Sequence, residues 1–118
     1  MTLIEFFEKD SIENICSSLT HPAERVILLG NKFKFMNRCA DQYRTVLETR
    51  GINTEFICKT INRNNMESII SSLSEIVEEY VDCVFDLTGG DDLFLVAAGI
   101  VFERYKERNI QMHRFNRS

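Results

Sequence analysis

Glycine, proline and histidine are scarce in this 118-residue chain, and several familiar catalytic motifs are missing. The five glycines form no G-x-G-x-x-G after the first predicted strand and no P-loop, which argues against a dinucleotide-dependent enzyme. There is no Gly-x-Ser-x-Gly elbow, and no cysteine and histidine stand in an evident catalytic arrangement. The sequence therefore gives no support to the common nucleophilic or redox enzyme classes.

Metal-binding patterns are equally sparse. The four cysteines contain no C-x-x-C pair, and the two histidines are too few to complete a zinc site at short spacing. Each cysteine lies in or beside an apolar segment, so we expect buried thiols at Cys16, Cys39, Cys58 and Cys83. We expect no resident metal and no cofactor.

Strong charge and long apolar runs are also lacking. A net charge of −4 provides no general attraction to nucleic acid or to an anionic membrane. The longest apolar run, residues 93–102, is about half the length that a membrane-spanning helix needs. The first residues lack the basic region and apolar stretch of a signal peptide. These features predict a soluble cytoplasmic protein with reduced thiols.

What the chain does contain is a regular alternation of strand and helix patterns. The predicted strands cover residues 3–7, 26–30, 54–58, 83–87 and 110–115. The predicted helices run from residue 10 or 11 to the step before Pro22, over 36–47 ahead of Gly51, over 66–80 and over 91–107. This alternation predicts the α/β class: a Rossmann-like, doubly wound parallel sheet of five strands, order 3-2-1-4-5, with helices on both faces.

The length fits one domain over residues 1–118. The sequence ends directly after the last predicted strand, which suggests the N-terminal part of a longer protein.

A double-glycine turn is the most informative segment. Residues 83–92 read Cys-Val-Phe-Asp-Leu-Thr-Gly-Gly-Asp-Asp, so a buried strand leads into a sharp turn and then into a helix. Glycine suits backbone that bends and presents its N–H groups to a ligand. The alternative is that the glycines only make a tight turn, with Asp91 capping the next helix.

The predicted strand order places a binding site at this turn. In open α/β sheets, ligands bind beyond the carboxyl ends of the strands where the strand order reverses, here between the first and fourth strands. Candidate ligand-binding residues follow the first, second and fourth strands: Glu8, Lys9, Asp10, Ser11, Asn31, Lys32, Thr88, Gly89, Gly90, Asp91 and Asp92.

The sequence Asp86-Leu87-Thr88-Gly89-Gly90, followed by an apolar helix with Ala97-Ala98, resembles CARF domains, the CRISPR-associated Rossmann-fold sensors of cyclic oligoadenylate. Their signature after the fourth strand is Asn or Asp, an apolar residue and Thr-Gly-Gly, usually followed by Thr-Lys. The similarity in element order extends over the whole chain. It is strongest to the N-terminal sensor domain of CRISPR-associated restriction-like nucleases.

This resemblance implies a function in antiviral defence. It implies a homodimer that binds a cyclic oligoadenylate, or a related nucleotide, across its two-fold axis and so controls an attached C-terminal effector nuclease. Thr88, Gly89 and Gly90 would contact phosphate or ribose, and the 8–11 loop would close over the ligand. The domain itself would be regulatory rather than catalytic.

The sequence departs from the family at Asp91-Asp92, which stand where Thr-Lys is usual. A phosphate ligand then needs compensation from Lys9, Lys32, a partner subunit or a metal. Two alternatives remain open at this point. One is a metal-dependent nuclease similar to the PIN/NYN class, with Asp86, Asp91 and Asp92 as metal ligands. The other is a dimerisation scaffold that has lost ligand binding.

Overall fold

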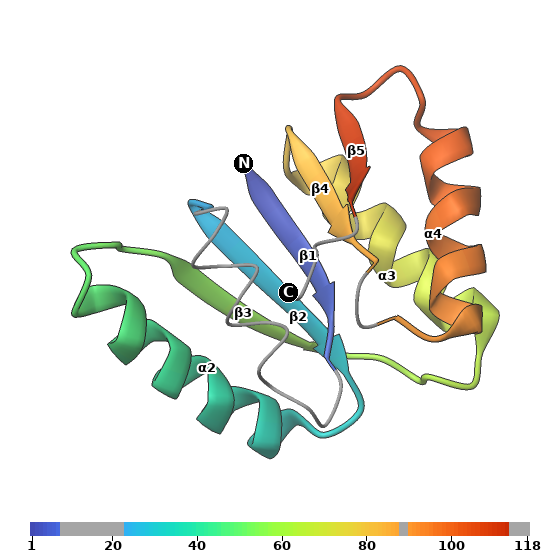
Figure 1. The fold of residues 1–118 in the computed structure, drawn as a ribbon. Helices are drawn as coiled ribbons and strands as arrows, with labels where there is room; N and C mark the ends of the chain where they lie inside the picture. Colours follow the sequence, from blue (N-terminus) through green and yellow to red (C-terminus); the bar gives the residue numbers. More distant parts are fainter. Residues whose placement is uncertain (8–22, 88–89, 114–118) are drawn as a thin grey trace.

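The computed structural model describes residues 1–7, 23–87 and 90–113, which form a five-stranded parallel sheet with three described helices (Figure 1). The strands are β1 (Thr2–Phe6), β2 (Arg25–Gly30), β3 (Glu55–Thr60), β4 (Cys83–Asp86) and β5 (Ile110–His113). The helices are α2 (Phe33–Glu48), α3 (Met66–Glu79) and α4 (Asp92–Arg104). No described helix is long and apolar enough to cross a membrane.

The strand order is β3-β2-β1-β4-β5, with every neighbouring pair parallel. This confirms the predicted Rossmann-like sheet and its order. The central strand β1 is buried along its whole length, because β2 and β4 flank it and side chains cover both of its faces. Runs without polar alternation, such as Val26–Leu29, are typical of such doubly covered parallel strands.

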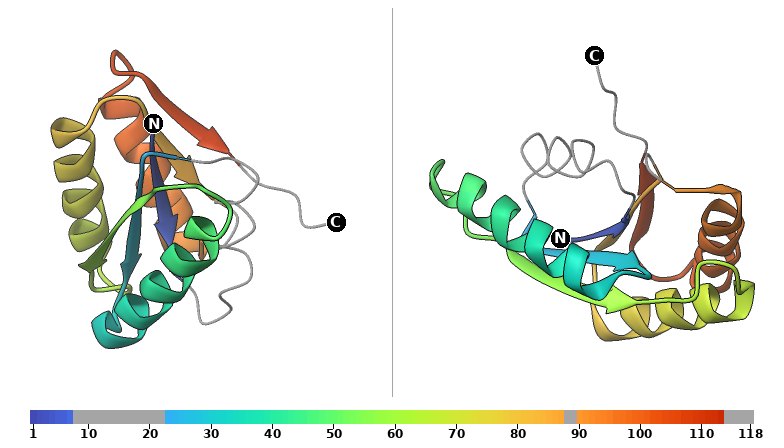
Figure 2. Two further views of the ribbon diagram at one scale, coloured as in Figure 1. Left: turned by 90° about the vertical axis from the view of Figure 1, so that its left-hand side faces the viewer. Right: turned by 90° about the horizontal axis from the view of Figure 1, so that it is seen from below.

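Helices cover both faces of the sheet, as predicted. α2 lies on one side, while α3 and α4 lie together on the other (Figure 2). Successive side chains of a strand point to opposite faces, so β1 contributes Ile4 and Phe6 to the α3–α4 side and Leu3 to the α2 side. Two apolar cores result, one on each face of the sheet.

Element boundaries differ from the sequence predictions by a few residues. β3 runs to Thr60, two residues farther than predicted, and α4 ends at Arg104 rather than at residue 107. The end of α4 is set by the C-cap Tyr105, which leaves the helical region and bonds through its N–H to Val101. The predicted first helix, and the part of the last strand beyond residue 113, lie outside the described residues.

The prediction of buried thiols is confirmed for Cys39 and Cys83. Burial raises the pKa of Cys83 to about 11, so this thiol is uncharged and unreactive near neutral pH. Cys58 is only half-buried, which corrects the prediction: it lies on β3, an edge strand whose side chains are covered less completely. Cys16 lies outside the described residues.

Candidate functional site

The carboxyl ends of the four strands β1 to β4 bring several segments together at one edge of the sheet. Phe7 follows β1, Asn31 and Lys32 follow β2, and Arg63 lies in the connection after β3. β1 is flanked by β2 on one side and by β4 on the other, so the strand order reverses there. Ligand sites of open α/β sheets are found at this kind of position.

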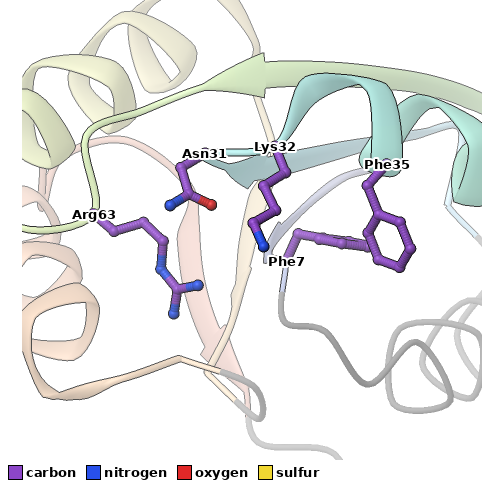
Figure 3. Close-up of a pocket in the computed structure, with 5 residues that line it drawn as sticks. All are labelled: Phe7, Asn31, Lys32, Phe35 and Arg63. Atoms are coloured by element: carbon purple, nitrogen blue, oxygen red, sulfur yellow. The ribbon is translucent and has the colours of Figure 1, made fainter.

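A pocket of about 180 Å³ lies at this edge (Figure 3). Its described lining combines two positively charged side chains, one amide and two aromatic rings: Phe7, Asn31, Lys32, Phe35 and Arg63. In the close-up, Asn31 lies between Arg63 and Lys32, with Phe7 and Phe35 beyond the lysine. The structure thus brings two of the predicted site residues, Asn31 and Lys32, into one pocket.

A close approach of backbone positions the polar part of the pocket. A Cβ on Gly30 would lie 2.8 Å from Met36 Sδ and 3.4 Å from the Cβ of Phe7, so any larger residue at the end of β2 would have to displace the Met36 side chain. The Lys32 carbonyl then accepts the N–H of Met36 and opens the helix, 2.9 Å from N to O. Asn31 and Lys32 are thereby held between the end of β2 and the first turn of α2.

The aromatic part of the pocket rests on a buried ring. Phe7 is 5% exposed, and its ring meets that of Phe35 edge-on, with centroids 5.7 Å apart and planes at 69°. Phe35 is more than a third exposed, so one ring anchors the other at the pocket mouth. Exposed aromatic faces of this kind can stack with a nucleobase.

Arg63 is the site residue that the sequence reasoning missed. Its guanidinium carbon lies 4.7 Å from the centre of the Phe6 ring, and its Nη2 lies 3.7 Å from Asp91 Oδ2. A signal was available: residues directly after β3 reach the same edge as those after β1, β2 and β4, because all four strands are parallel. Arg63 provides a cation at the edge where Asp91 and Asp92 place negative charge.

The structure describes only part of the glycine turn. The Gly90 N–H donates to the Leu87 carbonyl across the turn, with an N···O distance of 3.3 Å. Asp91 is the N-cap of α4, and its Oδ1 accepts the Phe94 N–H at 2.9 Å. Its neighbour Asp92 is exposed in the first helical turn. The remaining predicted site residues lie outside the described residues: Thr88, Gly89, Glu8, Lys9, Asp10 and Ser11.

Among residues 1–7, 23–87 and 90–113, no group of three or more His, Cys, Asp or Glu side chains is arranged to hold a metal ion. Asp86, Asp91 and Asp92 therefore form no such group. The capping bond and the Arg63 contact account for both oxygens of Asp91. The described part of the chain gives the metal-dependent alternative no ligand set.

Two buried acids lie just before the turn. Glu5 on β1 and Asp86 on β4 are register partners, 1% and 4% exposed respectively, on the face of the sheet that α2 covers. Among the described residues no N–H or O–H donor reaches the carboxyl oxygens of Glu5, and the polar group that faces them is the Asp86 carboxylate, to which a protonated Glu5 can donate a hydrogen bond. Burial, reinforced by the facing Asp86, raises the pKa of Glu5 well above its ordinary value. Glu5 therefore favours its protonated form at the strand pair where the sheet order reverses.

Several solved structures are similar to this chain, including the following two. One is Can2 from Sulfobacillus thermosulfidooxidans in complex with cyclic tetra-adenylate, with a TM-score of 0.76 and 21% identity over 98% of this chain. The other is the protein VC1899 from Vibrio cholerae, with a TM-score of 0.65 and 20% identity over 88% of this chain.

The matches span 32% of the Can2 chain and 28% of the VC1899 chain, so this chain corresponds to about a third of either protein. No protein-family model and no curated protein matches the sequence. At these identities, the similarity establishes the fold.

Proposed function

We propose that this chain is a CARF-like ligand-sensing domain that binds a cyclic oligoadenylate at the carboxyl edge of its sheet. The observation that carries the proposal is the pocket at the carboxyl edge of the sheet, beside the central strand β1, lined by two cations and two aromatic rings. Cations suit phosphates, and aromatic rings suit bases. The fold shared with Can2, solved in complex with cyclic tetra-adenylate, supports this ligand class.

The proposal includes a homodimer that binds the ligand across its two-fold axis and an attached effector nuclease that responds. In this scheme binding changes the geometry of the dimer, and the effector reads that change as an allosteric signal. The domain acts by binding and not by catalysis. The arrangement of Asn31, Lys32 and Arg63 supports a binding role, since these side chains supply hydrogen-bond donors and charge without an evident nucleophile.

Thermal unfolding in the presence of cyclic oligoadenylates tests the proposal directly. At about a hundredfold excess over the dissociation constant, the matching ring size should stabilise the folded state by about 2.7 kcal/mol, which raises Tm by about 10 °C. Linear adenylate and cyclic di-GMP serve as controls, and light scattering on the same samples reports the dimer. A flat response to cyclic tri-, tetra- and hexa-adenylate contradicts the proposal, and a monomer with bound ligand contradicts its dimeric form.

The Lys32→Gln variant tests whether the ligand binds in the pocket. Removing one charge-assisted phosphate contact is expected to weaken binding about 10- to 100-fold, because such contacts contribute about 1.5–3 kcal/mol. Lys34→Gln is the matched control: it removes the same charge two residues away, from an exposed position outside the described pocket lining. Titration calorimetry measures the ligand affinity of both variants. Equal losses in the two variants would mean that only overall charge matters.

A further inference from the structure

Arg63 belongs to the pocket and also faces an acid from another loop. The Arg63 side chain extends from the β3–α3 connection over the pocket (Figure 3). Its Nη2 lies 3.7 Å from Asp91 Oδ2, and its guanidinium lies over the Phe6 ring. The aromatic contact places the charge beside the Phe6 ring. The acid partly neutralises that charge within the protein itself.

The contact between Arg63 and Asp91 is suited to exchange. At 3.7 Å the two atoms form an ion pair without a hydrogen bond, and the side chains are 27% and 40% exposed. Pairs of this kind contribute little in water. A phosphate oxygen can instead receive parallel N–H donors from a guanidinium, which gives a shorter and stronger contact. A phosphate group in the pocket would therefore compete well for Arg63.

Asp91 is held in place independently of Arg63. Its Oδ1 accepts the Phe94 N–H at 2.9 Å, and its backbone carbonyl accepts the Leu95 N–H at 3.0 Å. These bonds anchor the carboxylate at the start of α4, where the helix dipole also favours a negative charge. The acid remains beside the pocket whether or not Arg63 stays with it.

We propose that Asp91 is an internal competitor for Arg63, which a phosphate-bearing ligand must displace. This inference rests on the proposed function of the pocket as a phosphate-ligand site. Arg63 then supplies the cation that binds the phosphate, and Asp91 lowers the affinity for every anionic ligand. Anions of low charge bind poorly because they do not displace the Asp91 carboxylate from Arg63. In this way Asp91 raises the ligand concentration at which the sensor responds.

Asp91→Asn tests this competition because asparagine keeps the Oδ1 that caps α4 and removes the charge that faces Arg63. Titration calorimetry with pyrophosphate should show about fivefold tighter binding than wild type, since the lost pair and the lost repulsion act in the same direction. Asp92→Asn is the matched control: it removes the same charge one residue on, from an exposed side chain with no ion pair among the described residues, and should change affinity less than about twofold.

Arg63→Gln completes the test. It should weaken pyrophosphate binding about tenfold, and in the Arg63→Gln/Asp91→Asn double variant the gain from Asp91→Asn should fall below about twofold. The proposal is contradicted if Asp91→Asn and Asp92→Asn raise the affinity for pyrophosphate equally. It is also contradicted if Asp91→Asn raises that affinity about fivefold in the Arg63→Gln background.

Cyclic tetra-adenylate, titrated in parallel, separates this inference from the proposed function. If pyrophosphate gives the expected pattern and no cyclic oligoadenylate binds, the competition stands and the adenylate ligand is wrong. If cyclic tetra-adenylate binds wild type and Asp91→Asn equally, the competition is wrong and the sensor function stands. If neither probe binds either protein, both proposals are contradicted.

Discussion

Glu5→Gln is expected to raise the free energy of unfolding by about 1–3 kcal/mol near pH 8, the range for removing a buried polar group whose ionised form no donor reaches. The side chain is 1% exposed, and among the described residues no donor reaches its carboxyl oxygens, which face the Asp86 carboxylate. Glutamine has the same shape and carries no charge at any pH. Its amide can also donate to the facing Asp86 carboxylate, with which position 5 is in register.

The expected gain depends on pH in a definite direction. Burial and Asp86 raise the pKa of Glu5 in the folded state, so the folded chain holds this proton more tightly than the unfolded chain does. Wild-type stability therefore falls as pH rises from the ordinary glutamate value toward the raised one, by at most about 1.4 kcal/mol per pH unit for one proton. The glutamine variant lacks this slope. The difference between the two proteins should be small at pH 4–5 and grow toward pH 8.

Urea unfolding at several pH values measures this difference. Glu48→Gln is the control: it removes a carboxylate from an exposed position on α2, and should leave both the stability and its pH dependence close to wild type. A Glu5→Gln protein that is less stable than wild type at pH 8 would show instead that the Glu5 carboxyl is required in its ionised form. That outcome would contradict the inference that Glu5 is protonated in the folded protein.

Most of the fold could be predicted because the signals that specify it are local or follow from chirality. Val26–Leu29 is apolar without alternation, which identifies a strand covered on both faces. The helical spacing in residues 66–80 is unbroken, and the structure places α3 there. Right-handed crossovers then leave few possible strand orders, and 3-2-1-4-5 is the one observed.

The candidate site could be predicted only in part because its chemistry depends on contacts between loops. Topology identified the edge, and Asn31 and Lys32 were found because they directly follow a strand. Arg63 was missed because the candidate residues were taken only from the ends of the first, second and fourth predicted strands. Its meeting with Phe6 and Asp91 depends on side-chain packing, which no sequence spacing encodes. The same holds for Glu5, whose burial opposite Asp86 requires the strand register.

Gly90→Ala is expected to destabilise the protein by about 1–3 kcal/mol, the cost of inserting a methyl group into a well-packed core. A Cβ built on Gly90 collides with the Phe94 ring, which is fully buried. That ring packs against Phe6 with centroids 4.8 Å apart, and Phe6 in turn supports the Arg63 guanidinium. The substitution therefore displaces Phe94 and, through Phe6, the Arg63 guanidinium at the pocket. Ligand affinity should fall together with stability.

Gly99→Ala is the matched control for this prediction, because a Cβ there meets nothing within 4 Å and the residue lies inside α4. Alanine at an unstrained helix position should raise stability by about 0.5–1 kcal/mol and leave ligand affinity unchanged. Thermal unfolding and calorimetry of the two variants then separate a general helix effect from a local clash. If Gly90→Ala unfolds at the wild-type temperature, the Phe94 ring moves without cost, and the contacts from Gly90 through Phe6 to Arg63 do not position the cation.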